Sequence, residues 1–237
     1  MKVIGIIPSR FNSTRFPGKP LADINGKSMI QRVYEQCMKS DRLDEVVVAT
    51  DDDRILSHVK QFGGKVIMTS SIHTTGTERC CEATKMLSNK YSIIVNIQGD
   101  EPLINPLQID ELLMLFNDKN TQIGTLAYKI DNLAELKNKN NPKAIFDNKG
   151  YATNFCRVIE STKKNISYYK HIGLYGYRRD ILNKICLIPP SKNEMKEKLE
   201  QLRWLDNKYK IKVGETIYKS YSVDIPEDIE KIKLQLI

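Results

Sequence analysis

The chain has 237 residues, which is enough to bury one sizeable hydrophobic core, so we expect a single domain spanning residues 1–237. Apolar residues make up 41% and charged residues 28%, as in ordinary globular proteins, and no apolar run approaches the roughly 20 residues that cross a bilayer. The formal net charge of +8 comes from scattered lysines and arginines without interleaved aromatic residues, which argues against a nucleic-acid-binding protein and favours an anionic small molecule as the partner.

Apolar runs of strand length alternate with helical patterns in the first half of the chain, and this alternation is typical of βαβ units. The N-terminal run ends at Pro8 and Arg10 without a small-residue cleavage site, so it predicts a first strand rather than an export signal. The predicted strands are residues 2–8, 45–50, 65–68, 92–98 and 123–130. The predicted helices are residues 28–39, 52–62, 77–87 and 106–117, with N-caps at Ser28, at Asp51 or Asp52, and at Thr77. We therefore expect an α/β fold with a doubly wound, mostly parallel sheet.

The second half begins with a segment that lacks clear periodicity. Residues 133–164 are rich in Asn and Lys, so we expect an inserted arm or lid, at about residues 133–170, rather than a part of the central sheet. Regular structure returns with a predicted strand at residues 171–177 and a predicted helix at residues 194–207. A last helix is predicted to open at Pro226.

The five cysteines show no C-x-x-C spacing and are odd in number, which is typical of a protein from a reducing cytoplasm. We expect each of them to be a small buried apolar residue without catalytic or metal-binding chemistry. They are Cys37, Cys80, Cys81, Cys156 and Cys186.

The loop that follows the first strand carries three cations within ten residues. Arg10, Arg15 and Lys19 lie in the stretch PSRFNSTRFPGKPL, at the carboxyl end of a strand, where open α/β sheets bind ligands. Ser9, Ser13 and Gly18 leave backbone N–H groups for the oxygens of a triphosphate. The loop has neither G-x-x-x-x-G-K-[ST] nor G-x-G-x-x-G, so a P-loop ATPase and a dinucleotide oxidoreductase are disfavoured. The alternative is that these are solvated loop cations.

Two aspartates are candidate metal ligands. Asp100 follows a predicted buried strand and therefore lies at the carboxyl edge of the sheet, and Asp224 precedes the last helix. A cation that bridges phosphates takes one or two carboxylates completed by water and substrate, which this pair supplies. As alternatives, Asp100 is a turn residue in GDEP and Asp224 is a helix N-cap.

Blocks of sequence along nearly the whole chain resemble the CMP-Kdo synthetases, the 3-deoxy-manno-octulosonate cytidylyltransferases. They are IIPSRFNSTRFPGKPL, ATDDDRI, GTER, VNIQGDEPLI, HIGLYGYR, LEQLR and VDIPEDIE, and they occur in the order found in that family. The resemblance implies a fold like that of nucleotide-diphospho-sugar transferases. It also implies an enzyme that transfers CMP from CTP to the anomeric hydroxyl of Kdo, releasing pyrophosphate, for lipopolysaccharide or capsule synthesis.

The resemblance further implies a set of roles. Arg10, Lys19 and Asp100 are implied to be catalytic, Mg²⁺ is the implied cofactor, held by Asp100 and Asp224, and the implied assembly is a homodimer. The implied nucleotide-binding residues are Pro8, Ser9, Arg10, Ser13, Arg15, Lys19, Thr75 and Arg79. The implied sugar-binding residues are Gln98, His171, Tyr175, Glu200 and Gln201.

Some of these residues have a structural alternative. Arg79 has Glu78 and Glu82 as alternative partners on its own helix, and Glu200 fits a solvated helical face. A lone histidine at the start of a strand, such as His171, is most often structural. His58 and His73 are interpreted as incidental, and three dispersed histidines do not make a zinc site.

The hypothesis for the mechanism is in-line attack of the sugar hydroxyl on the α-phosphorus of CTP, assisted by positioning and charge neutralisation and without a dedicated side-chain base. The sequence departs from the family pattern at residues 141–165, and Ile225 stands where the family has threonine. An alternative acceptor is therefore 8-amino-Kdo or another ulosonic acid. The alternatives from other classes are a non-catalytic nucleotide-binding module and, more distantly, an RNA-binding protein.

Overall fold

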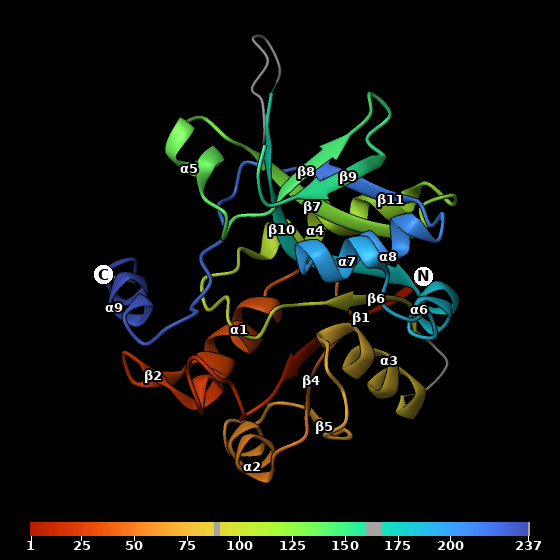
Figure 1. Cartoon of the computed structure of the whole chain (residues 1–237). Coiled ribbons are helices and arrows are strands. Elements are labelled where there is room, and N and C mark those ends of the chain that lie inside the picture. The colour runs from red at the N-terminus through yellow and green to blue at the C-terminus, as the bar shows by residue number, and fades with distance from the viewer. Residues whose placement is uncertain (88–90, 160–166, 237) are drawn as a thin grey trace. The chain divides into compact units, whose positions relative to one another are not determined.

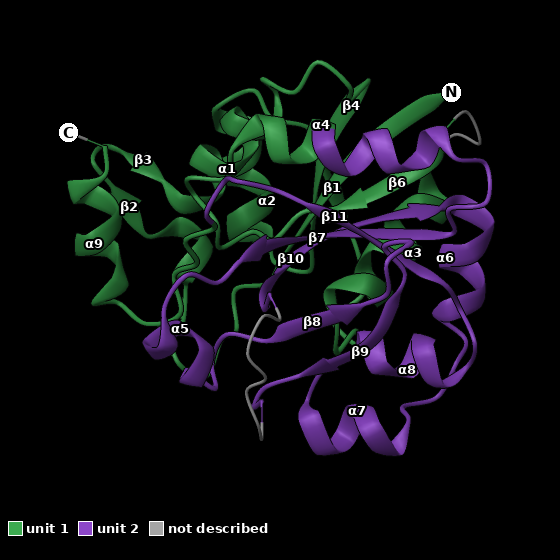
Figure 2. Cartoon of the chain, turned by 90° about the horizontal axis from the view of Figure 1, so that it is seen from above, with its two compact units in different colours: residues 1–110, 220–237 green, residues 111–219 purple. Residues whose placement is uncertain are grey.

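The computed structural model describes residues 1–87, 91–159 and 167–236 (Figure 1). It divides into two compact units, one formed by residues 1–110 and 220–237 and the other by residues 111–219 (Figure 2). Each unit contains its own strands and helices, and the α/β class predicted from the sequence is confirmed. Within the described ranges, none of the helices has the length and apolarity that spanning a membrane requires.

Unit 1 is built on four parallel strands in the order β6, β1, β4, β5. They are β1 (Lys2–Ser9), β4 (Glu45–Thr50), β5 (Val66–Met68) and β6 (Tyr91–Asn96). The register pairs Ile6 with Val47 on one side and with Asn96 on the other. Residues 3–7 of β1 and 46–50 of β4 are all buried, which is why these strands read as continuous apolar runs. The parallel order places the carboxyl ends of all four strands at one edge of this sheet.

Four α-helices precede the C-terminal segment in the described part of unit 1, and side chains cap the first three of them. They are α1 (Met29–Cys37), α2 (Asp53–Gln61), α3 (Gly76–Met86) and α4 (Pro106–Met114), the last of which continues into unit 2. The predicted caps Ser28 and Asp52 are confirmed, because their side chains accept from the backbone N–H of Gln31 and Arg54. The predicted cap Thr77 is wrong, because Thr75 caps α3 through a capping box with Glu78.

The C-terminal segment of unit 1, residues 220–237, packs against the region between β1 and α1. The helix α9 (Asp228–Leu234) contacts β2 (Asp23–Ile24), which forms a short hairpin with β3 (Lys27–Ser28). The 3-10 helix η1 (Lys19–Leu21) precedes this hairpin in the chain. Ile24, Met29, Val223 and Ile232 form a small buried apolar cluster there. This cluster fixes residues 220–237 against the loop that follows β1.

Unit 2 holds a mixed sheet. Strand β7 (Ile123–Lys129) pairs antiparallel with β10 (Tyr169–Arg178) and parallel with β11 (Ile211–Glu215). Strand β8 (Lys143–Phe146) pairs antiparallel with both β9 (Ala152–Cys156) and β10. The remaining elements are η2 (Leu115–Asn117), α5 (Leu133–Lys137), α6 (Arg179–Ile185), α7 (Lys192–Glu197) and α8 (Gln201–Asp206).

The segment predicted to lie outside the sheet contributes to it. Residues 143 and 144 in β8 pair with residues 170 and 169 in β10, so the expectation of an arm without sheet contacts is wrong for β8. The short strands escaped prediction because Asn and Lys dominate their flanks. Residues 160–164 of that segment lie outside the described residues. The proposed lid or dimer arm, and the single-domain boundaries, stay predictions.

The helix predicted at residues 194–207 is two helices. Lys198 adopts φ +54°, a left-handed conformation that ends α7, and its N–H bonds the carbonyl of Glu194. The buried guanidinium of Arg203, in α8, donates two hydrogen bonds to the Glu194 carboxylate, from Nη2 over 2.6 Å and from Nε over 2.7 Å. The break is therefore stabilised by a bidentate ion pair across it.

None of the five cysteines forms a disulfide. Cys37, Cys80 and Cys81 are buried, as expected, whereas Cys156 and Cys186 are half-buried. Burial raises the pKa of Cys37 well above the ordinary thiol value, so this thiol stays protonated and apolar in character.

Candidate active site

A pocket opens at the carboxyl edge of the unit 1 sheet, and all of its lining residues belong to that unit. Three segments line it: the loop after β1, the loop that enters α3, and the turn after β6. The residues are Pro8, Ser9, Arg10, Ser13, Arg15, Lys19, Pro20, His73, Thr74, Thr75, Gly76, Arg79, Gln98, Gly99 and Asp100. All eight predicted nucleotide-binding residues are among them, together with Gln98 and Asp100.

The loop after β1 has a defined turn. Gly18 adopts φ +73°, and its N–H donates to the Phe11 carbonyl over 3.0 Å. The backbone angle favours glycine here, and a Cβ at this position would make a tight contact of 3.1 Å with the Phe11 ring. The turn delivers Lys19 directly into the first position of η1, beside the pocket.

Lys19 is fixed between two acceptors. Its Nζ donates to Asp100 Oδ2 over 2.6 Å and to the carbonyl of Val223 over 2.8 Å. The N–H of Val223 donates in turn to the Asp100 carbonyl over 2.9 Å. These contacts bring together the loop after β1, the turn after β6 and the C-terminal segment, three parts of the chain that are far apart in sequence.

Asp224 follows Val223 in the chain and pairs with Arg15, in the loop after β1. Arg15 Nη2 donates to Asp224 Oδ1 over 2.8 Å. The N-cap alternative for Asp224 is wrong, because α9 begins at Asp228 and its N-cap residue Glu227 makes no side-chain cap bond. Asp228 instead accepts from the N–H groups of Asp224 and Ile225. The carboxylate of Asp224 is therefore turned toward Arg15 rather than toward the helix.

One buried hydroxyl in the pocket lacks a protein partner. Ser9 is 5% exposed, and its Oγ has no hydrogen-bond partner within the described residues. Buried hydroxyls are rarely left in this state, so this group is suited to a polar ligand.

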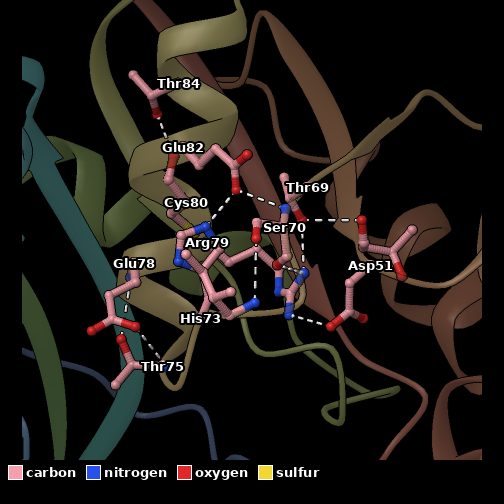
Figure 3. A network of polar contacts seen from close by, with 12 residues as sticks. Asp51, Thr69, Ser70, His73, Thr75, Glu78, Arg79, Cys80, Glu82 and Thr84 are labelled. Carbon is pink, nitrogen blue, oxygen red and sulfur yellow. Dashed lines mark hydrogen bonds and ion pairs between the residues drawn. The ribbon is translucent and has the colours of Figure 1, made fainter.

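Arg79 is anchored inside unit 1 by an extended polar network (Figure 3). Its side chain is 3% exposed and donates to Asp51 Oδ2 over 2.9 Å, to Thr69 Oγ1 over 2.7 Å and to the Ser70 carbonyl over 3.3 Å. Its ion-pair partner is therefore Asp51, at the end of β4, and not Glu78 or Glu82 on its own helix. The network fixes this guanidinium at the base of the pocket wall.

Two glutamates of α3 hold the loop 69–75 that lines the pocket (Figure 3). Glu82 accepts from the Ser70 N–H over 2.9 Å and from His73 Nε2, and Glu78 accepts from the Thr74 N–H over 2.8 Å. Burial opposes the ionisation of Glu82, but the bonds from Ser70 and His73 outweigh it and lower the pKa of this carboxyl. Both carboxylates thus act as ionised anchors for the loop.

His73 is a pocket residue that sequence reasoning misses. The sequence predicts no role for it, yet it lines the pocket and is held by Glu82. A signal is present, since His73 lies two residues before the helix cap at Thr75, and the first turn of a helix in an α/β protein often faces a ligand.

Four of the predicted sugar-binding residues belong to unit 2. His171, in β10, is 7% exposed, lies 5.1 Å from Phe155 and 5.3 Å from Tyr175 between ring centroids, and its Nε2 is 2.9 Å from Thr125 Oγ1. Burial lowers the pKa of His171 to about 3, so the imidazole is neutral. Within unit 2 this histidine belongs to an aromatic cluster, which matches its structural alternative.

Tyr175 is a member of the same cluster, and Glu200 acts on it electrostatically. Tyr175 stacks on Tyr177 and meets Trp204 edge-on, with centroid distances of 6.0 and 5.2 Å. Its buried Oη has no hydrogen-bond partner within the described residues, and burial, with the Glu200 charge, raises its pKa well above the ordinary value. Gln201 is 5% exposed at the start of α8. The Glu200 position is thus near an aromatic site rather than on an isolated solvated face.

The carboxylates of unit 1 suit a divalent cation that shares its coordination with a substrate. No group of three or more His, Cys, Asp or Glu residues able to hold a metal occurs in the described part of the chain. Asp100 and Asp224 instead offer two carboxylates joined through the Val223 backbone. Two carboxylate ligands, completed by phosphate oxygens and water, are what Mg²⁺ takes in nucleotide sites, so the residues fit this ion.

Residues 4–213 match the family model of the cytidylyltransferases. A 3-deoxy-manno-octulosonate cytidylyltransferase from Parabacteroides distasonis is 52% identical, with 98% of this chain and 96% of that protein covered. The chain belongs to the 3-deoxy-manno-octulosonate cytidylyltransferase family. Another cytidylyltransferase of this name, from Phocaeicola vulgatus, is 49% identical over 98% of this chain and 96% of its own.

A solved structure of a CMP:2-keto-3-deoxy-manno-octonic acid synthetase complexed with CTP resembles this cytidylyltransferase closely. The TM-score is 0.94 at 36% identity, with 100% of this chain and 98% of that chain covered. A glucose-1-phosphate thymidylyltransferase from Bacillus anthracis, described as putative, matches with a TM-score of 0.72 at 14% identity, which indicates the shared fold alone. The fold predicted for the cytidylyltransferase from its sequence, that of the nucleotide-diphospho-sugar transferases, is confirmed.

Proposed function

We propose that this enzyme transfers the cytidylyl group of CTP to the anomeric hydroxyl of Kdo and releases pyrophosphate. The observation that carries the proposal is end-to-end similarity to 3-deoxy-manno-octulosonate cytidylyltransferases in a chain whose pocket combines phosphate-binding cations with two carboxylates. Similar proteins of that name at 43–52% identity cover nearly the full chain, so another ulosonic acid is not favoured as the acceptor.

The phosphate-binding part of the pocket supplies most of the catalysis. Arg10, Arg15 and Lys19 neutralise the triphosphate and the departing pyrophosphate, and Ser9 Oγ donates a hydrogen bond to a phosphate oxygen. Phosphoryl transfer needs little covalent help from the protein, so placing charges around the α-phosphorus and aligning the sugar hydroxyl accounts for the acceleration. The loop 69–75 and Arg79 support the nucleoside end of CTP.

We propose Mg²⁺ as the cofactor, held by Asp100 and Asp224. When bound, it neutralises phosphate charge and polarises the α-phosphate toward attack. His171, Tyr175, Glu200 and Gln201, together with Gln98, are proposed to contact the acidic sugar. The resemblance further supports a homodimer in the cytoplasm, and sedimentation velocity of the purified protein tests the dimer.

The reaction is tested by pyrophosphate release from CTP and Mg²⁺ with Kdo, 8-amino-Kdo or N-acetylneuraminate, with UTP and ATP in place of CTP as nucleotide controls. We expect release with CTP and Kdo. Asp100→Asn should lower kcat/KM by about a hundredfold or more, whereas the matched control Asp180→Asn, an exposed pair partner of Lys184, should not change it. No release with any acceptor would overturn the proposal, and release only with another sugar would overturn the assignment of Kdo.

A further inference from the structure

The proposed phosphate cations and the proposed metal ligands are paired with one another. Lys19 Nζ lies 2.6 Å from Asp100 Oδ2, and Arg15 Nη2 lies 2.8 Å from Asp224 Oδ1. Each cation therefore binds carboxylate oxygens that would otherwise coordinate a metal. In the same way, each carboxylate binds a cation that would otherwise pair with a phosphate. Either ligand arriving alone must break an ion pair before it gains full access to its own partners.

We infer that Lys19, and to a smaller extent Arg15, are placeholder cations: they hold the metal carboxylates in position and move to the phosphates when CTP and metal bind together. This inference rests on the proposed function. It adds a positioning role for Lys19 to its charge on the phosphates, and it makes the binding of the two ligands mutually reinforcing.

The two pairs differ in strength because their surroundings differ. The side chains of Lys19 and Asp100 are 15% and 27% exposed, whereas those of Arg15 and Asp224 are 65% and 43% exposed. Solvent screens the second pair, so its contribution is small, while the first is a short charge-assisted bond in a sheltered place. Lys19 is therefore the main placeholder.

The backbone allows this exchange without refolding. The bond from the Val223 N–H to the Asp100 carbonyl ties the two carboxylate-bearing segments by main-chain atoms that the exchange does not involve. Gly99 is also packed closely, since a Cβ there would lie 3.0 Å from the Pro8 carbonyl oxygen. The turn that carries Asp100 is thus held in place, and only side chains need to rotate.

The exchange predicts that removing the cation strengthens the binding of metal, and that removing the carboxylate strengthens the binding of CTP. Lys19→Met frees Asp100 and should tighten metal binding to the nucleotide-free protein. Asp100→Asn frees Lys19 and should tighten CTP binding in the absence of metal. A merely structural ion pair predicts the opposite, because losing either partner would loosen the site for both ligands.

The first test is Mn²⁺ binding to the nucleotide-free protein, followed by the electron paramagnetic resonance signal of free Mn²⁺. We expect Lys19→Met to tighten binding by about tenfold and Arg15→Gln by about two- to threefold. The control Lys27→Met removes a lysine from an ion pair of the same 2.6 Å length with Glu35, neither of which lines the pocket, and should leave Mn²⁺ binding unchanged. Unchanged or weaker binding in both Lys19→Met and Arg15→Gln would overturn the inference.

The second test is CTP binding by calorimetry in EDTA. We expect Asp100→Asn to bind CTP about tenfold more tightly than the unaltered protein, while Asp180→Asn binds it equally. Weaker binding by Asp100→Asn would overturn the inference. Thermal unfolding of each variant checks its fold, and the exposed Arg15 provides a variant that is not expected to unfold. The proposed function is tested by a different measurement, the turnover of the unaltered enzyme, so its failure can be told apart from failure of this inference.

Discussion

Arg79 and Asp51 form an ion pair between α3 and the end of β4, with a distance of 2.9 Å between Arg79 Nη2 and Asp51 Oδ2. The two residues are 28 positions apart, and the guanidinium is almost completely shielded from water. A buried cation of this kind depends on its partner, because an uncompensated charge in the interior is costly. The pair therefore joins a pocket wall to the sheet.

Asp51→Asn should lower the free energy of unfolding by about 3 kcal/mol, because Arg79 would keep its charge in a buried place without its ion-pair partner. Urea denaturation measures the change. Asp180→Asn, which removes one partner of an exposed pair, is the matched control and should change the free energy by less than about 0.5 kcal/mol. Equal effects of the two substitutions would contradict the buried ion pair.

Glu82→Gln should raise the KM for CTP by about tenfold and leave kcat nearly unchanged, because the loop 69–75 loses its ionised anchor while the phosphate cations are untouched. Steady-state kinetics measure both constants, and Glu230→Gln, which changes an exposed side chain of α9, is the control. The folded-state pKa of Glu82 is lowered, so its stabilising contribution is present above its ordinary value of 4.5 and is lost as the pH falls below it. A fall in kcat with unchanged KM would contradict the anchoring role.

His171→Gln should make the protein less sensitive to mild acid. The unfolded chain takes up a proton at His171 near pH 6.5, whereas the folded protein does so only at about 3, so folding stability falls as the pH drops below 6.5. Between pH 7 and pH 5 this histidine should account for about 2 kcal/mol of lost unfolding free energy. Urea denaturation at both pH values gives the difference, and an equal loss in the variant would contradict the buried neutral state.

Lys198→Gly should raise the free energy of unfolding by about 0.5 kcal/mol, since glycine adopts the left-handed angle at this position without the strain that a Cβ brings. Lys196→Gly, inside α7, is the control and should lower it by about 0.5–1 kcal/mol. Thermal or urea unfolding compares them. Destabilisation by Lys198→Gly equal to that of the control would show that residues 194–207 behave as one continuous helix.

Many strands and helix starts of unit 1 can be predicted from the sequence because neighbouring residues determine them. Val46, Val47 and Val48 give an uninterrupted apolar run of a buried parallel strand, and Ser28 and Asp52 stand directly before amphipathic helices. The loop after β1, which we propose to bind phosphate, likewise stands out in the sequence by its three cations after a strand, and the structure places all three in the lining of one pocket. The cap of α3 is local too, since the reciprocal T-x-x-E pattern at residues 75–78 indicates Thr75 rather than the predicted Thr77.

The unpredicted features depend on contacts between distant residues. The left-handed turn at Lys198 is stabilised by the Glu194–Arg203 pair, which nothing in the local propensity of an Asn- and Lys-rich segment reveals. The pairing of Arg79 with Asp51 and of Lys19 with Asp100 likewise requires the folded sheet, since each joins different elements. His73 escapes prediction because its position two residues before the Thr75 cap is a weak signal by itself, and its pairing with Glu82 is visible only in the folded chain.

The bonds from Lys19 to Val223 and from Val223 to Asp100 also have a consequence for biosynthesis. Residues 220–237 belong with residues 1–110, yet the ribosome makes all of residues 111–219 before it reaches them. A nascent chain can therefore form the loop after β1 and the Asp100 turn early, but until translation has passed Asp224 it lacks the second carboxylate and the Val223 carbonyl, which is one of the two acceptors of Lys19. Stalled or prematurely terminated chains are thereby kept from assembling the full set of charged groups, and this set is acquired only after the intervening unit has been synthesised.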